Sequence, residues 1–169
     1  YEILPQVKPS RAHFGNVKKD IVGFPLPVLA VCGDQQASMY AAGIQKGTTK
    51  VTHGTGTCIM QIMGEHFRLK KPFFTTLVPS RSKPLFALEA KIDRSGKQVE
   101  LLLGKPEELR LLLNRIAQQV DWYLKRLPFQ PTEIVVDGGV TRLEYVQQIQ
   151  AEVSQIPIRR QKVFDGTAL

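Results

Sequence analysis

The sequence has few cysteines and no long apolar run. Its 169 residues include only two cysteines, Cys32 and Cys58, which are too few for a disulfide framework. No group of side chains has the spacing of a metal site, so we expect no metal held by the chain itself. No run approaches the roughly 18 apolar residues that a membrane helix requires, so we expect no membrane partner. The low cysteine content favours a reducing compartment, the cytoplasm.

The chain also lacks an initiating methionine and a signal peptide. It opens with Tyr1 and Glu2 and closes with Asp165-Gly166-Thr167-Ala168-Leu169. Signal peptides have an apolar core behind a basic start, and no such pattern is present. From these two ends we expect the sequence to be a fragment of a longer protein.

Acidic residues are outnumbered by basic ones. Lys and Arg total 23 against 15 Asp and Glu, which gives a net charge of +8. Such a charge is compatible with nucleic-acid binding. The basic residues, however, are spread along the chain, and aromatic residues do not alternate with them in any stretch. We therefore expect no nucleic-acid partner, because a small polyanionic ligand or solubility alone would account for the charge.

The most informative stretch is residues 31–64. An apolar run at residues 28–31 predicts a strand, Cys32 and Gly33 end it, and Asp34 opens a predicted helix. Asp34 has two interpretations. Its carboxylate caps the helix by accepting hydrogen bonds from free N–H groups, or it accepts the proton of an attacking hydroxyl.

A glycine–threonine turn follows within the same stretch. Residues 50–52 and 58–63 read as two strands, joined by Gly54-Thr55-Gly56-Thr57. This turn is either a tight hairpin connection, for which glycine supplies positive φ, or a cradle in which backbone N–H groups approach phosphate closely.

The remainder alternates strands and helices. Residues 1–15 read as a loop, and residues 73–78 and 85–90 read as paired strands. Residues 107–127 form the clearest amphipathic helix, with apolar residues at i, i+3 and i+4. A β-branched strand at 133–136 leads through Asp137-Gly138-Gly139 into a second amphipathic helix, and 157–160 reads as another strand. This pattern predicts an α/β fold.

Four motifs occur in an order that resembles a known family. The sequence reads GDQQA at residues 33–37, GTGT at 54–57, ALEA at 87–90 and VDGG at 136–139. It resembles the C-terminal half of the FGGY carbohydrate kinases, and GDQQA is most similar to their glycerol kinase branch. The resemblance implies a ribonuclease H-like, actin-like ATPase domain with a mixed sheet and flanking helices. It also implies transfer of the γ-phosphate of ATP, with Mg²⁺, to a hydroxyl of a polyol or sugar.

The resemblance also implies roles for individual residues. Asp34 would be the general base on the acceptor hydroxyl, and Gln35 would hydrogen-bond the substrate. The β- and γ-phosphates of the nucleotide would be held by Gly54, Thr55 and Gly56. Gly96 would approach the nucleotide, and Gly138 and Gly139 would border adenosine.

The same resemblance predicts the domain organisation. Residues 1–27 would be the tail of a missing N-terminal kinase domain, and residues 28–169 the nucleotide-binding domain, truncated at its C-terminus. Since a kinase site of this kind lies between two domains, we expect the chain to be inactive alone. We also expect the exposed apolar surface left by the missing domain to favour a homo-oligomer.

The chain departs from the family in its middle. The family carries a long segment between ALEA and DGG that is absent here, Leu143 stands where the family has Asn, and Glu100 stands where it has Gln. These departures leave an alternative open: a degenerate, non-catalytic relative that serves as a nucleotide-binding or scaffolding module. The kinase interpretation makes a geometric prediction, that Asp34, Thr55 and Gly138 lie at one edge of the sheet.

Overall fold

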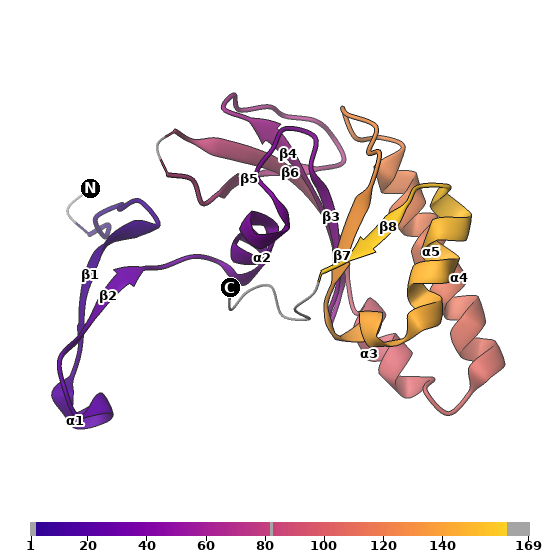
Figure 1. The fold of residues 1–169 in the computed structure, drawn as a ribbon, viewed down its shortest axis with the longest axis horizontal. Helices are drawn as coiled ribbons and strands as arrows, with labels where there is room; N and C mark the ends of the chain where they lie inside the picture. Colours follow the sequence, from indigo (N-terminus) through magenta and orange to yellow (C-terminus); the bar gives the residue numbers. More distant parts are fainter. Residues whose placement is uncertain (1–2, 82, 162–169) are drawn as a thin grey trace. The chain divides into compact units, whose positions relative to one another are not determined.

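The structure is a computed structural model that describes residues 3–81 and 83–161, and Figure 1 shows its fold. The backbone forms two compact units, the first ending at Gly33 and the second beginning at Asp34. The candidate site is contained in the second unit.

The first unit is a two-stranded antiparallel ribbon. Strand β1 (Arg11–Val17) pairs with β2 (Leu26–Ala30), and the short helix α1 (Lys19–Val22) lies between them in sequence. The prediction of a loop up to Gly15 is wrong, since β1 begins at Arg11. The register shifts between Arg11 and Gly15, where Gly15 has a φ of 121°, and such a bulge interrupts the alternation by which a strand is recognised.

The second unit is built on a six-stranded mixed sheet, in the order β5-β6-β4-β3-β7-β8. Its strands are β3 (Thr49–His53), β4 (Thr57–Gly64), β5 (Phe74–Val78), β6 (Leu85–Ile92), β7 (Ile134–Asp137) and β8 (Ile158–Arg160). The two predicted hairpins form the antiparallel half, and β3, β7 and β8 run parallel. The predicted strands of this unit are confirmed.

Helices cover both faces of this sheet (Figure 1). Helices α4 (Pro106–Leu124) and α5 (Glu144–Ser154) lie on one face, and α2 (Asp34–Ala42) lies on the other. A short helix α3 (Ser95–Leu101) follows β6, and a 3₁₀ turn η1 (Gly139–Arg142) precedes α5. Pro106 opens α4, as expected of a residue that has no N–H to leave unpaired.

Alternation along β4 divides the core into two layers. Ile59 and Met63 pack in the cluster that contains the apolar stripe of α4, whereas Met60 and Ile62 pack with Met39 of α2. Successive side chains of a strand point to opposite faces, so one strand supplies both layers. No helix in the described part of the chain combines the length and apolar character needed to cross a membrane.

A buried polar cluster lies on the α2 face of the sheet. Lys50 Nζ of β3 and Asp137 Oδ1 of β7 are 2.7 Å apart, and their side chains are only 1% and 3% exposed. Ser38 of α2 donates a hydrogen bond to Asp137, and Lys50 donates one to Thr52. Burial lowers the pKa of Lys50, and the nearby Asp137 carboxylate opposes that shift. The cluster joins β3 to β7 close to the ends from which the chain enters Gly54 and Gly138.

Candidate active site

Asp34 and the glycine–threonine turn face one hollow. The hollow has a volume of about 680 Å³ and is lined by Asp34, Gln35, Thr52, Gly54, Thr55, Gly56, Cys58, Glu89, Lys91, Asp93, Arg94 and Lys97. Asp34 is the exposed first residue of α2, and its Oδ1 accepts a hydrogen bond from the Gln35 N–H at 2.8 Å. Gln35 Oε1 is buried and accepts no hydrogen bond from the described residues. The hollow therefore brings together a carboxylate, an amide acceptor and a glycine turn.

The turn at residues 54–56 is packed against the backbone of residues 92–96. The Gly96 N–H donates to the Thr55 carbonyl at 3.0 Å, and a Cβ on Gly96 would lie 1.9 Å from the Gly54 carbonyl oxygen. A Cβ on Gly56 would lie 2.8 Å from the Ile92 carbonyl oxygen. Because real Cβ atoms do not come this close to backbone oxygen, both positions require glycine.

Gly138 makes a third close approach to the same region. Its φ is 94°, and a Cβ there would lie 2.5 Å from the carbonyl oxygen of His53, the residue before Gly54. Strands β3 and β7 are parallel, so His53 and Asp137 lie at the same end of the sheet. The predicted gathering of Asp34, Thr55 and Gly138 at one sheet edge is thus what the structure has.

The other predicted glycines do not line the hollow. Gly96 is buried behind the turn within α3, and Gly138 contacts the backbone of β3. Gly139 is exposed at the start of η1, with open space where a Cβ would stand. Packing therefore accounts for Gly96 and Gly138 without a ligand, and contact of any of the three with nucleotide stays a prediction.

The hollow also contains side chains to which the sequence alone assigned no role. Glu89 is 3.5 Å from Gln36 Nε2 and 3.7 Å from Cys58 Sγ. Burial, with the Glu89 carboxylate, raises the pKa of Cys58 to about 12, so this thiol is protonated and a poor nucleophile at neutral pH. The basic residues Lys91, Arg94 and Lys97 also line the hollow. Only the pairing of β6 with β4, which sets Lys91 opposite Cys58, would have pointed to them.

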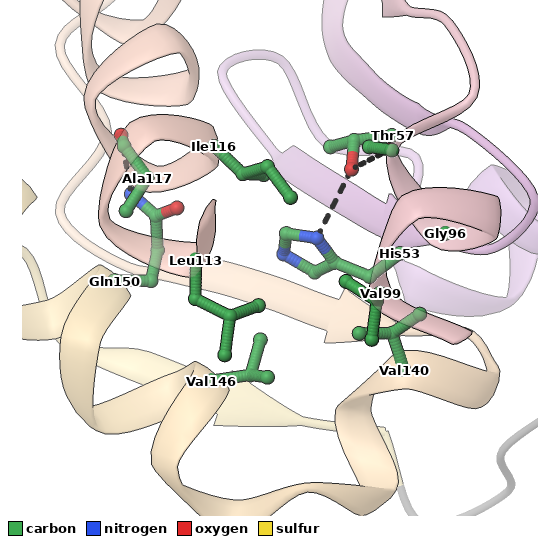
Figure 2. Close-up of a pocket in the computed structure, with 11 residues that line it drawn as sticks. His53, Thr57, Gly96, Val99, Leu113, Ile116, Ala117, Val140, Val146 and Gln150 are labelled. Atoms are coloured by element: carbon green, nitrogen blue, oxygen red, sulfur yellow. Dashed lines mark hydrogen bonds between the residues drawn. The ribbon is translucent and has the colours of Figure 1, made fainter. Parts of the chain in front are cut away.

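Behind the turn, His53 faces a small cavity on the α4 and α5 side of the sheet (Figure 2). Its Nδ1 is 3.2 Å from Thr57 Oγ1, which is 2.9 Å from Ser95 Oγ. Its Nε2 is buried and has no hydrogen-bond partner among the residues that the structure describes. Burial lowers the pKa of His53 to about 4, so the imidazole is neutral at pH 7.

Comparison with known proteins shows which proteins this chain resembles in sequence. No protein-family model matches the chain. The glycerol kinase of Rippkaea orientalis is 24% identical to it, over 98% of this chain and 45% of that protein. The glycerol kinase of Thermococcus gammatolerans is 36% identical over 102 residues, which are 59% of this chain and 21% of that protein. The chain is a homologue of the glycerol kinases. The resemblance to the C-terminal half of an FGGY kinase is confirmed.

Solved structures show the same fold. The glycerol kinase of Plasmodium falciparum, solved with ADP, superposes with a TM-score of 0.84 at 22% identity, covering 99% of this chain and 46% of that one. The xylulose kinase of Rhodospirillum rubrum gives a TM-score of 0.71 at 17% identity, covering 96% and 46%. The predicted ribonuclease H-like, actin-like ATPase fold is confirmed.

The alignments also measure a difference in length. Nearly all of this chain aligns with the curated glycerol kinases, but it spans slightly less than half of their length. The alignment with the Rippkaea orientalis enzyme occupies 230 positions, whereas this chain has only 169 residues, so the relative fills at least 61 positions alone. That relative therefore carries at least 61 residues that have no counterpart in this chain.

The glycine contacts predict position-specific costs. Replacing Gly96 or Gly138 by alanine should lower the free energy of unfolding by roughly 1–3 kcal/mol each, since the added Cβ must displace backbone. Gly139→Ala is the matched control, because its Cβ would meet open space, and it should change stability by less than about 0.5 kcal/mol. Urea unfolding measures all three, and equal effects at Gly138 and Gly139 would contradict the packing.

The environment of His53 predicts a pH dependence of stability. Its pKa falls from 6.5 to about 4 on folding, which corresponds to about 3 kcal/mol. Between these values the unfolded chain binds the proton and the folded chain does not, so stability should fall as pH drops from 6.5 to 4. Urea unfolding of His53→Gln should lack this component, while the exposed His66→Gln should retain it. Identical profiles for all three proteins would refute the assignment.

Proposed function

We propose that this chain is the nucleotide-binding half of an ATP-dependent kinase that phosphorylates a hydroxyl of a polyol or sugar, with glycerol as the preferred acceptor. The observation that carries the proposal is the shared hollow, in which Asp34 and the glycine–threonine turn at residues 54–56 face the same space. The homology to glycerol kinases supports the choice of reaction and acceptor class.

The side chains at the hollow have suitable chemistry for the two reactants. Asp34 is exposed at the start of α2, where its carboxylate can accept the proton of an attacking hydroxyl. Gln35 contributes an amide oxygen that a substrate hydroxyl would satisfy. The backbone of Gly54, Thr55 and Gly56 can approach the β- and γ-phosphates closely because no Cβ stands between it and a ligand at the glycines. Gly138 and Gly139 would border adenosine.

Magnesium fits this arrangement as an ion held chiefly by the nucleotide. The described residues contain no group of three or more His, Cys, Asp or Glu side chains that could hold a metal ion. Mg²⁺ in phosphoryl-transfer sites is bound through substrate phosphates and one or two carboxylates, and Asp34 and Glu89 both line the hollow. When bound, the ion neutralises charge on the transferred phosphoryl group.

The whole reaction requires more than this chain. We propose that an N-terminal kinase domain closes over the hollow and that the chain alone is inactive. We also propose that the protein acts in the cytoplasm. Catalysis of phosphoryl transfer consists mainly of positioning and charge stabilisation, which one wall of a site cannot provide. Residues 1–27 would then belong to the connection with that domain.

One observation favours the alternative of a non-catalytic nucleotide-binding or scaffolding module. The relatives fill at least 61 alignment positions that this chain lacks. Calorimetric titration of the full-length protein with Mg²⁺ and ATP tests the scaffold, which no detectable binding would support and a dissociation constant well below millimolar would contradict. A non-catalytic nucleotide-binding module would bind ATP without forming ADP when glycerol is added, whereas the kinase would form ADP.

Asp34 provides the direct test of the mechanism. Asp34→Asn in the full-length protein should lower glycerol-dependent ADP formation by about 10²–10⁴-fold, because the amide cannot accept the hydroxyl proton. ATP binding should change little. Asp20→Asn, an equal charge change in α1, is the control and should retain activity. Undiminished turnover of Asp34→Asn would remove Asp34 from the mechanism.

A further inference from the structure

Two basic side chains at the hollow have no partner within the described part of the chain. Arg94 and Lys97 are both exposed and line the hollow, and neither forms an ion pair or hydrogen bond through its side chain with a described residue. The third basic residue there, Lys91, lies 3.6 Å from Asp93. Arg94 and Lys97 thus differ from Lys91 in carrying charge that no described carboxylate neutralises by contact.

These two residues flank the segment that contacts the glycine turn. Gly96, between them, donates its N–H to Thr55, and a Cβ on Gly56 would lie 3.6 Å from the Arg94 backbone nitrogen. Arg94 has a φ of 57°, an uncommon conformation for a residue with a side chain. The backbone of Arg94 is therefore fixed beside the turn by the close packing of residues 92–96.

Carboxylates and basic side chains occupy different parts of the hollow's lining. Its carboxylates are Asp34, Glu89 and Asp93, of which Glu89 contacts Gln36 and Cys58, and Asp93 is near Lys91. Arg94 and Lys97 are the cations next to the turn whose glycines can approach phosphate. A guanidinium or ammonium there can form charge-assisted hydrogen bonds to phosphate oxygens, which are stronger than neutral ones.

We propose that Arg94 and Lys97 bind the terminal phosphates of the nucleotide and make this site selective for di- and triphosphates over monophosphates. The inference rests on the proposed function for the identity of the nucleotide, but the recognition itself concerns a polyphosphate. It assigns a binding role to two side chains at the start of α3 that lie outside the four sequence motifs.

The test is a comparison of ligands that differ in phosphate number. Calorimetry of the full-length protein should show that Arg94→Gln/Lys97→Gln weakens ADP and pyrophosphate at least tenfold and AMP less than threefold. The matched control is Lys70→Gln/Arg110→Gln, which removes the same charge from exposed positions that do not line the hollow. The salt dependence of ADP binding should also be shallower in the first variant alone. Thermal melting verifies that both variants are folded.

The outcomes separate this inference from the proposed function. Pyrophosphate binding that depends on the two cations, without binding of ADP, supports the polyphosphate site and refutes the nucleotide. Equal ADP affinity in the two double variants overturns the role of Arg94 and Lys97 and leaves the kinase proposal intact. If neither ADP nor pyrophosphate binds, both proposals fail.

A second inference comes from the cavity behind the turn. His53 and Gln150 are 3% and 1% exposed, and His53 Nε2 and Gln150 Oε1 both lack a hydrogen-bond partner among the described residues. Both residues line one cavity, together with Thr57, Ser95 and apolar side chains such as Leu113 and Ile116 (Figure 2). The volume open to the centre of a water molecule is about 10 Å³, which suits one water and nothing larger.

We infer that one buried water bridges His53 Nε2 and Gln150 Oε1. The water accepts a hydrogen bond from an Nε2–H and donates one to the amide oxygen, while Nδ1 accepts from Thr57. The resulting chain runs from α5 through His53 and Thr57 to Ser95 of α3, directly behind the glycine turn. It supplies both buried atoms with the partner that such atoms normally have.

Two measurements on the full-length protein test the water. A crystal structure should show a solvent peak within about 3.2 Å of both atoms. Nitrogen-detected NMR at pH 7 should find His53 as the Nε2–H tautomer, with the exposed His13 and His66 as references. An empty cavity would overturn the inference, and a proton on Nδ1 would overturn the direction assigned to the hydrogen bond at Nε2.

Discussion

The candidate site depends on backbone packing that only glycine permits. Three segments meet at the edge of the sheet: the turn at residues 54–56, the connection at residues 92–96, and Gly138 after β7. At Gly56, Gly96 and Gly138 a Cβ would lie within 3 Å of a carbonyl oxygen of another segment. The turn is therefore main chain held by main chain, so its position does not depend on side-chain rotamers.

The buried ion pair beneath this edge sets where the segments meet. Lys50 lies three residues before His53, Asp137 immediately precedes Gly138, and Thr52 lies opposite Asp137 in the parallel register. Desolvating two charges offsets most of their attraction, so the pair is weak evidence of stability. A shift of β7 by one residue, however, would leave both charges buried and unpaired. We attribute to the pair the register that aligns Gly138 with His53.

Sequence reasoning succeeded where a pattern is local and failed where it depends on pairing. The apolar stripe of α4 and the glycine–threonine turn are each encoded within a short window, and both were predicted. Strand β1 was missed because its bulge at Gly15 breaks the alternation of side chains between the two faces. It has no buried residue, and only its pairing with β2 identifies it as a strand. Arg94 and Lys97 were missed for a similar reason, because a basic residue after a strand gains meaning only when the turn of another hairpin packs beside it.

The shortened middle of the chain bears on whether catalysis is retained. The sequence places the missing segment between Ala90 and Asp137, where only residues 102–105 join α3 to α4. Near this junction Leu101 and Leu111 are 80% and 66% exposed. Asp34, by contrast, begins α2, the turn joins β3 to β4, and Gly138 follows β7, and these three strands are almost entirely buried. Asp34 and the turn thus lie outside the shortened region, whereas Asp93, Arg94 and Lys97, which also line the hollow, lie within it. The close packing at Gly56, Gly96 and Gly138 requires glycine for stability whether or not a ligand binds. A phosphate site is therefore favoured by the hollow that Asp34 shares with the turn, and not by the glycines alone.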